Sequence, residues 1–226
     1  MSLDLSAFKA QQLEMAGRTI TTGSLSAVRR FVALDMSNRA RSTDPLFAAA
    51  VVFETGNPEP LEVKTALLDD TFPYIPGFLS FREAPVLLEA LKQLETPYDL
   101  LWVDGFGRLH PRRAGIATHL GVTLGKAAIG IAKTPFVGSV AALNEEAGST
   151  ATVTLQGEVL AYALRTRRKS KPVFVSSGNG CSLEAALEFV EAHLDGLRLP
   201  YPSREAHLHA NAARKAWEGE RAAREE

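Results

Sequence analysis

The spacing of apolar residues along the chain predicts an α/β protein. An amphipathic helix is expected over residues 6–19. Three apolar runs then predict strands, over 29–37, 45–55 and 60–69. The two connections between these strands, 38–45 and 55–60, are short and rich in Asn, Asp, Gly and Pro, which favours hairpins. This part of the chain is therefore expected to form a three-strand antiparallel meander.

Helices alternate with apolar strands in the rest of the chain. Helices are expected over 80–95, 114–125 and 182–194, and strands over 98–104, 127–133 and 172–178. Buried strands that alternate with helices require a sheet that is covered on both faces. The predicted fold is a mixed central sheet that includes the meander, with helices on both faces.

A last helix is expected over residues 203–226, with Ser203 as its N-cap. From about residue 213 the helix carries charges of both signs, and this end is expected to fray. No linker, internal repeat or low-complexity segment interrupts the sequence. Residues 1–226 are therefore expected to form a single domain.

The composition is that of an ordinary globular protein, with 46% hydrophobic and 23% charged residues. The apolar runs are too short to span a bilayer, and the acidic, amphipathic start of the chain does not resemble a signal peptide. The one cysteine, Cys181, has no disulfide partner in the chain, which agrees with a reducing compartment. We expect a cytoplasmic monomer.

The charge pattern gives only local indications of a nucleic-acid partner. The formal net charge is -1, so any binding to phosphate has to come from a local basic patch. Two candidates are "HPRR" at 110–113 and "RTRRKSK" at 165–171. On charge alone, each is more often a solvated loop than a binding site.

Two aspartates, Asp35 and Asp104, end apolar strands. A buried acid is costly unless a cation or a hydrogen-bond donor satisfies it, although either aspartate alone is also explained as the cap of a turn. Glu83 lies on the helix expected between the two strands. If the strands are neighbours, the three carboxylates converge on an oxygen-rich site that suits Mg²⁺ or Mn²⁺, ions that assist phosphoryl displacement.

Other polar residues lie near this predicted site. Lys133 ends another strand, where it would offset the charge of a phosphate or simply be an exposed lysine. His110 and His119 flank the helix after Asp104, and His207 lies on the last helix. Each histidine is either a hydrogen-bond donor close to the site or a polar residue in a crevice where its hydrogen bonds are made within the protein.

The segment "PYIPGFLSFREAP", residues 73–85, is unusually stiff for a connection. Pro73 and Pro76 fix backbone angles, and Gly77 permits a sharp exit, so Tyr74 and Ile75 are presented with little conformational freedom. From these residues alone, the segment is a rigid turn that leads into a helix.

Four stretches together resemble the endonuclease V family, whose members nick DNA at deoxyinosine. They are "PYIPGFLSFREAP", "VDGFGRLHPRRAGIATHLGV", "IGIAK" and "GLRLPYPSREAHL". The resemblance implies a ribonuclease H-like fold, with Asp35 and Asp104 as metal ligands and Glu83 as the helix glutamate that binds metal or orients water. It also implies that Lys133 contacts phosphate and that His207 lies near the metals. Residues 73–77, with Tyr74, correspond to the wedge that enters the duplex beside the damaged base.

The implied function is that of a DNA repair endonuclease that uses Mg²⁺, with Mn²⁺ as a substitute. It would hydrolyse the second phosphodiester bond 3′ to deoxyinosine and leave a 3′-hydroxyl and a 5′-phosphate, with Arg112 and Arg113 on phosphate. Two alternatives remain open: an endoribonuclease for inosine-containing RNA, since the 2′-hydroxyl is sensed by contacts that sequence does not reveal, and a lesion-binding protein with little turnover.

Three positions differ from the family pattern. Phe106 replaces the histidine of the DGHG motif, Asn179 replaces a late histidine, and the segment "DMSNR" after the first strand lacks the usual tyrosine. None of these differences removes a carboxylate, but Phe106 cannot donate the hydrogen bond that a histidine can.

Overall fold

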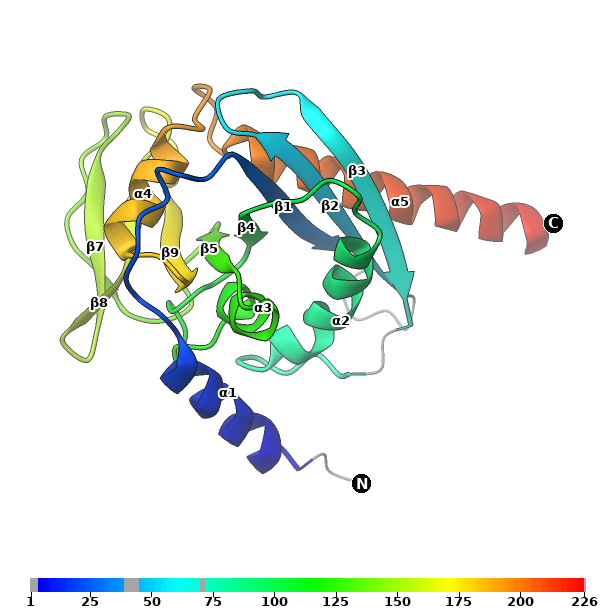
Figure 1. Cartoon of the computed structure of the whole chain (residues 1–226), viewed down its shortest axis with the longest axis horizontal. Helices are drawn as coiled ribbons and strands as arrows, with labels where there is room; N and C mark the ends of the chain where they lie inside the picture. The colour runs from blue at the N-terminus through cyan, green and yellow to red at the C-terminus, as the bar shows by residue number, and fades with distance from the viewer. Residues whose placement is uncertain (1–3, 39–44, 70–71, 226) are drawn as a thin grey trace.

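The computed structural model describes residues 4–38, 45–69 and 72–225, and within these ranges one mixed sheet of nine strands crosses the molecule (Figure 1). The strand order is β3-β2-β1-β4-β5-β9-β8-β7-β6. The strands are β1 (Arg30–Ser37), β2 (Leu46–Glu54), β3 (Pro60–Leu68), β4 (Leu100–Asp104), β5 (Ala127–Ala132), β6 (Ser139–Val140), β7 (Thr150–Leu155), β8 (Glu158–Leu164) and β9 (Val173–Asn179). The helices are α1 (Ser6–Arg18), α2 (Leu79–Lys92), α3 (Ile116–Leu124), α4 (Leu183–Glu191) and α5 (Tyr201–Glu225).

The predicted meander is present at one side of the sheet. Strands β1, β2 and β3 pair antiparallel, whereas β1, β4 and β5 run parallel, so the carboxyl ends of these last three strands lie at the same edge. The expected turn at 38–45 falls mainly on residues 39–44, which lie outside the described residues. Parallel pairing of β1 with β4 is what brings the two predicted aspartates to one place.

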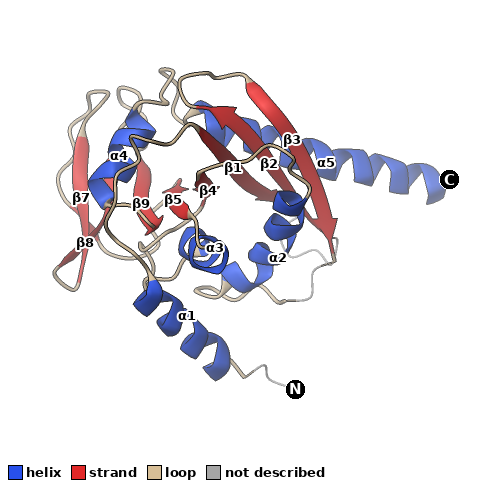
Figure 2. Ribbon diagram, in the orientation of Figure 1, coloured by secondary structure: helices blue, strands red, loops and turns tan. Residues whose placement is uncertain are grey.

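Helices cover both faces of the sheet, as the alternation of helices and buried strands predicts (Figure 2). One apolar layer joins α4 and α5 to the side chains of β1, β4 and β9 that point toward them. The other layer joins α2 and α3 to the alternate side chains of β1, β2 and β4. Burial on both faces explains why these strands read as continuous apolar runs.

The sheet continues beyond β9 into strands that the apolar pattern does not predict. Strands β7 and β8 form a hairpin whose connection is Gln156 and Gly157, both with positive φ, at 56° and 82°. Two residues of this kind suit the backbone of a tight hairpin turn. The alternating sequence "TATVTL" before this turn is the signal that identifies the hairpin.

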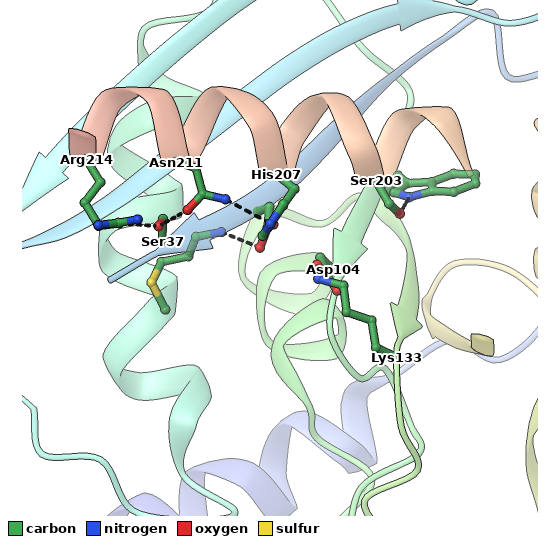
Figure 3. A network of polar contacts seen from close by, with 10 residues as sticks. Ser37, Asp104, Lys133, Ser203, His207, Asn211 and Arg214 are labelled. Atoms are coloured by element: carbon green, nitrogen blue, oxygen red, sulfur yellow. Dashed lines mark hydrogen bonds and ion pairs between the residues drawn. The ribbon is translucent and has the colours of Figure 1, made fainter. Parts of the chain in front are cut away.

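Helix α5 begins at Tyr201, two residues before the expected start. Ser203 is therefore not the N-cap. It lies in the first turn, where its hydroxyl accepts a hydrogen bond from the indole nitrogen of Trp102 at 2.9 Å (Figure 3). The helix runs past the sheet to Glu225, and the fraying of its end stays a prediction. In the described parts of the chain, no helix has the length and apolar character needed to cross a membrane.

A candidate active site at the carboxyl ends of β1 and β4

Asp35 and Asp104 lie side by side. The neighbouring parallel strands β1 and β4 pair Leu34 with Val103, and the two aspartates are the next residues of their strands. One oxygen of each carboxylate and one ring nitrogen of His207 all lie within 4.8 Å of one another. We call Asp35, Asp104 and His207 the acid cluster. The structure thus brings together residues that are far apart in the sequence, while their roles as metal ligands remain predictions.

The carboxylate of Asp35 is buried and uses both oxygens. Oδ1 accepts the Met36 backbone N–H at 2.7 Å, and Oδ2 lies 2.8 Å from Nδ1 of His207. Burial, reinforced by the charge of Asp104, raises the pKa of Asp35 to about 6, even though Lys133 and these hydrogen bonds oppose the rise. Ionisation of Asp35 is therefore less favourable than ionisation of a carboxyl group in water.

His207 is held by a chain of polar groups on α5 and β1 (Figure 3). The Asn211 amide nitrogen is 2.9 Å from His207 Nε2, and the Ser37 hydroxyl donates to Asn211 Oδ1 at 2.7 Å. Arg214 Nε donates to Ser37 Oγ at 3.0 Å. Because the amide nitrogen can only donate, Nε2 must accept, and the neutral ring then carries its proton on Nδ1, facing Asp35. We call Asn211, Ser37 and Arg214 the histidine support.

Sequence reasoning did not identify the histidine support. A usable signal was present, because His207, Asn211 and Arg214 have the i, i+4, i+7 spacing that places residues on one face of a helix. Ser37 has no such signal, since only the fold brings β1 against α5.

Lys133 immediately follows β5 and points at the acid cluster, as predicted from its place in the sequence. Its amine donates to Asp104 Oδ2 at 2.5 Å. Burial acts to lower the pKa of Lys133, but the charge of Asp104 and its hydrogen bond outweigh burial, so the pKa is raised. Lys133 therefore stays protonated and offsets one of the two aspartate charges.

Glu83 reaches the site from α2 but is not part of the acid cluster. It lines a cleft together with Asp104. Burial, followed by the charge of Asp35, raises the pKa of Glu83 to about 7, although Arg82 opposes the rise. A carboxyl group whose pKa lies near neutrality exists in both protonation states under physiological conditions.

The cleft beside these acids has a volume of about 300 Å³. Tyr74, Pro76 and Gly77 line one part of it, and Phe106 and Phe136 line another. The rings of the two phenylalanines lie 5.7 Å apart, which makes a largely apolar wall. Phe136 had not been singled out from the sequence, because nothing in "KTPFVG" distinguishes it from an ordinary loop residue.

The expected rigid turn is present at the mouth of the cleft. The Phe78 N–H donates to Ile75 O at 2.9 Å and closes a turn with Pro76 and Gly77 at its centre. Gly77 has φ 82°, a value that the third position of such a turn requires and that favours glycine. We call residues 73–78 the wedge turn. Tyr74 on this turn is 65% exposed.

Arg112 and Arg113 are engaged within the protein. The guanidinium group of Arg112 lies 4.3 Å from the centre of the Phe78 ring and donates to Gly77 O at 2.5 Å. Arg113 pairs with Glu158 at 2.9 Å. Their predicted contacts with phosphate would have to share or replace these bonds, and they stay predictions.

The two replaced histidines have different environments. Phe106 belongs to the apolar wall of the cleft, beside the acids. Asn179 pairs with Ala128 at the start of β5, whereas Asp104 pairs with Ile131, so Asn179 is displaced by about three residues, or roughly 10 Å, along the sheet. There its amide donates to Lys126 O at 2.9 Å and its oxygen accepts the Ile20 N–H at 3.0 Å. Asn179 is thus a connector between segments.

His110, His119 and Cys181 lie in buried environments that indicate structural roles. His110 is buried and lies 3.2 Å from Gly77 O through Nε2, and burial lowers its pKa to about 4. Burial also lowers the pKa of His119, to about 4, in a position against the Phe81 ring. Cys181 is buried, and burial raises the pKa of its thiol to about 12, so it is unreactive at neutral pH.

The acid cluster fits a hard divalent cation. Carboxylate oxygens are the ligands that Mg²⁺ and Mn²⁺ prefer. Burial is the main cause that raises the pKa values of Asp35 and Glu83, and the neighbouring carboxylates add an imbalance of negative charge. A bound divalent cation would remove this imbalance.

Comparison with known proteins identifies the family. The sequence profile of endonuclease V matches residues 13–208. This chain belongs to the endonuclease V family. Endonuclease V of Thermus thermophilus is 44% identical over 211 residues, which cover 92% of each chain. The endonuclease V structure from Bacillus subtilis superposes with a TM-score of 0.90 at 30% identity, over 97% of this chain and 95% of the other. The protein is therefore an endonuclease of this family, and its fold is ribonuclease H-like as predicted.

A further structure shows an endonuclease V with nucleic acid. The Ciona intestinalis enzyme was solved in complex with a 24mer DNA that contains an inosine followed by a ribo-adenosine. It is 26% identical to this chain, with a TM-score of 0.80 over 94% of this chain and 98% of that one.

Proposed function

We propose that this protein is a metal-dependent repair endonuclease for deoxyinosine in DNA. It hydrolyses the second phosphodiester bond 3′ to the lesion and leaves a 3′-hydroxyl and a 5′-phosphate. The observation that carries the proposal is the position of the cleft, which lies between the exposed Tyr74 and the carboxylates of Asp104 and Glu83. The inosine-containing DNA bound by the Ciona intestinalis relative supports the same substrate.

Recognition begins with removal of the altered base from the stack. Extrusion costs a few kcal/mol and costs least for a poorly paired base, so a deaminated adenine is favoured over an intact one. Tyr74 occupies the vacated space, and the extruded base enters the cleft against Phe106 and Phe136. A base stacked on an aromatic side chain gains roughly 1–3 kcal/mol, which offsets part of the cost of extrusion.

The acid cluster performs the hydrolysis. Asp35 and Asp104 would hold the divalent cation, Mg²⁺ by preference with Mn²⁺ as a substitute. When bound, such a cation stabilises the negative charge of the phosphate and promotes ionisation of water. Glu83 binds the cation or orients the attacking water, and its pKa of about 7 suits proton transfer near neutrality. Lys133, held protonated by Asp104, stabilises the charge on phosphate.

The basic segment 165–171 extends this site along the nucleic acid. Arg198 donates to Lys133 O at 3.2 Å and to Lys171 O at 3.1 Å, so one side chain joins the segment to the catalytic lysine. Arg167 and Lys171 are exposed there. We infer that this loop contacts phosphates next to the bond that is cut.

Inosine-containing RNA remains the second candidate substrate. The DNA bound by the Ciona intestinalis enzyme carries a ribonucleotide directly after the inosine, which favours a site that tolerates a 2′-hydroxyl. A lesion-binding protein with little turnover is less well supported. Phe106 and Asn179 leave every predicted carboxylate in place, and without a catalytic role this costly group of acids has no explanation.

The test uses end-labelled duplexes with one deoxyinosine, one inosine within RNA, or adenine at the same position. Each is incubated with Mg²⁺, Mn²⁺ or chelator at one salt concentration, and any nick is mapped to the nucleotide. A metal-dependent nick at the second bond 3′ to deoxyinosine supports the proposal. Faster cutting of RNA would favour the ribonuclease, and binding without a nick would favour the lesion-binding protein.

We further propose that residues 1–226 form one domain that acts as a monomer in the cytoplasm. The continuity of the sheet across the described residues supports a single domain. Light scattering during size exclusion tests the oligomeric state, and a dimer mass would contradict it.

A further inference from the structure

Helix α1 contributes one buried polar side chain to the wedge turn. Among the residues of α1, all of which are described, Gln12 alone is buried, with 1% of its surface exposed. Its neighbour Gln11 is exposed on the same helix. Burial of an uncharged amide is costly unless its polar atoms find partners.

The amide of Gln12 uses both of its ends. Nε2 donates to Gly77 O at 3.0 Å and lies 3.5 Å from Ala114 O, while Oε1 accepts from Arg112 Nε at 2.5 Å. Gln12 therefore links the wedge turn to the segment that follows the acid-bearing strand β4. This link requires a donor and an acceptor on one side chain, which Glu or Met does not provide at neutral pH.

Gly77 O is the point at which these contacts meet. It accepts from Gln12 and from Arg112 Nη2 at 2.5 Å, and His110 Nε2 lies 3.2 Å away. The ring nitrogen Nδ1 of His110 accepts the Arg112 backbone N–H at 3.2 Å, so the neutral ring carries its proton on Nε2 and donates to Gly77 O. Three donors from two segments thus fix the carbonyl that ends the wedge turn.

Tyr74, which the wedge turn carries, has a mostly exposed side chain. It is 65% exposed, and the Arg82 guanidinium lies 6.0 Å from its ring. Its placement therefore depends on the backbone of the turn that carries it. An exposed group that has to enter a base stack performs best when its backbone is held before binding, because less conformational entropy is then lost.

We propose that Gln12 is a positioning residue for lesion recognition: helix α1, through Gln12, Arg112 and Gly77 O, holds the wedge turn in the conformation that enters the duplex. The inference rests on the proposed function and adds an element to it. It also gives Arg112 a role other than the predicted contact with phosphate.

The variants are Gln12→Met, which keeps the size but removes all three hydrogen bonds, and Gln12→Glu, which keeps only the acceptor for Arg112. Gln11→Met is the matched control, because it makes the same chemical change at the adjacent exposed position. Two quantities are measured in the full-length protein. One is amide hydrogen exchange of residues 73–78 without DNA. The other is the ratio of affinities for deoxyinosine and adenine duplexes, in Ca²⁺ with the duplex verified to be intact.

Loss of the hydrogen bonds of Gln12 predicts about tenfold faster exchange in the wedge turn and about a tenfold lower affinity ratio for Gln12→Met. A smaller loss is expected for Gln12→Glu, and none for Gln11→Met. Unchanged exchange in the wedge turn, or an unchanged ratio despite a lower melting temperature, would overturn the inference and reduce Gln12 to a packing residue. If the unaltered protein itself shows no preference for deoxyinosine, the proposed function fails first, and the inference fails with it.

Discussion

The acid cluster and the wedge turn border the same cleft, yet their surroundings differ in charge. In the acid cluster, the buried carboxylate of Asp35 lies beside the partly buried carboxylate of Asp104, and burial together with the charge of Asp104 raises the pKa of Asp35 to about 6. In the wedge turn, Gly77 O is surrounded by donors, and the exposed Tyr74 carries no charge. The negative charges of the acid cluster are unfavourable, and a cation would offset them. The carbonyl of Gly77 in the wedge turn, by contrast, has all the hydrogen-bond donors that it needs.

This difference separates the two tasks of the enzyme. Changes to the acid cluster should alter turnover and the response to metal and pH, and should leave base preference intact. Changes to the wedge turn and to Gln12 should alter base preference and leave the response to metal intact. Enzymes usually place energetically unfavourable groups at the reactive site and hold them there with surroundings whose hydrogen bonds and packing are favourable.

The largest effect is expected for Asp35→Asn. Turnover should fall roughly a thousandfold, because loss of one charged ligand removes several kcal/mol of stabilisation of the phosphate. In chelator, the unfolding free energy at pH 8 should instead rise by about 1–3 kcal/mol, because the unfavourable charge is gone. Nicking assays and thermal unfolding measure the two quantities, with Asp69→Asn on the surface as control. Lower stability together with normal turnover would contradict the account.

The next largest effect is expected for Asn211→Leu in the histidine support. Loss of the amide donor frees the ring of His207, and partners of this kind contribute about 10- to 100-fold to metal affinity or activity. Mg²⁺ titration followed by thermal shift, together with kcat, measures the loss. His209→Ala on the same helix should change neither quantity. Equal behaviour of the two variants would show that the support has no influence on the site.

A smaller effect is expected from pH. The pKa of Asp35 is raised from 3.8 to about 6 and that of Glu83 from 4.5 to about 7, so the folded state binds more protons than the unfolded state between these values. In chelator, the contribution of Asp35 and Glu83 to stability should therefore fall as the pH rises from about 4 to about 7, while His110 and His119, whose pKa values are lowered to about 4, contribute in the opposite sense. Protons and Mg²⁺ compete for the same oxygens, so stabilisation by Mg²⁺ should be larger at pH 8 than at pH 5.5. Melting temperatures with and without Mg²⁺ test this, and equal shifts at both pH values would contradict it.

The smallest effect is expected in the basic segment 165–171. Arg167→Gln combined with Lys171→Gln should reduce the slope of log affinity against log salt by about 0.9 for each lost phosphate contact, without a change in base preference. The control pair, Lys64→Gln with Lys92→Gln, changes the net charge equally but lies on β3 and α2, toward the other edge of the sheet. An unchanged slope, or the same change in the control, would mean that the segment is a solvated loop without contacts to phosphate.

Much of the fold was predictable because its central strands are buried on both faces and read as continuous apolar runs. The β7–β8 hairpin was missed because β7, which lies near one end of the sheet, is only partly buried and is rich in threonine. Its alternation and its Gln-Gly turn were present in the sequence. The start of α5 was misplaced because Ser203, a residue typical of caps, serves Trp102 instead.

The site was predictable only in part. Asp35 and Asp104 were identified because acids at the ends of apolar strands are rare and need a reason. The buried partners of Gly77 O were not identified. Gln12 looks like an ordinary helix residue, and its contacts lie 65 and 100 residues away in the sequence. Arg112 looked like a phosphate ligand because its charge can be read from the sequence. Its contacts with the Phe78 ring and with Gly77 O cannot.

The central claim is that the acid cluster cuts while the wedge turn and the cleft recognise. The most direct measurement compares Asp104→Asn with the unaltered protein on deoxyinosine and adenine duplexes, with binding and nicking followed in the same Mg²⁺ reactions. The account predicts that the variant keeps its preference for the deoxyinosine duplex and makes no nick above background. Nicking by Asp104→Asn at the unaltered rate would contradict it.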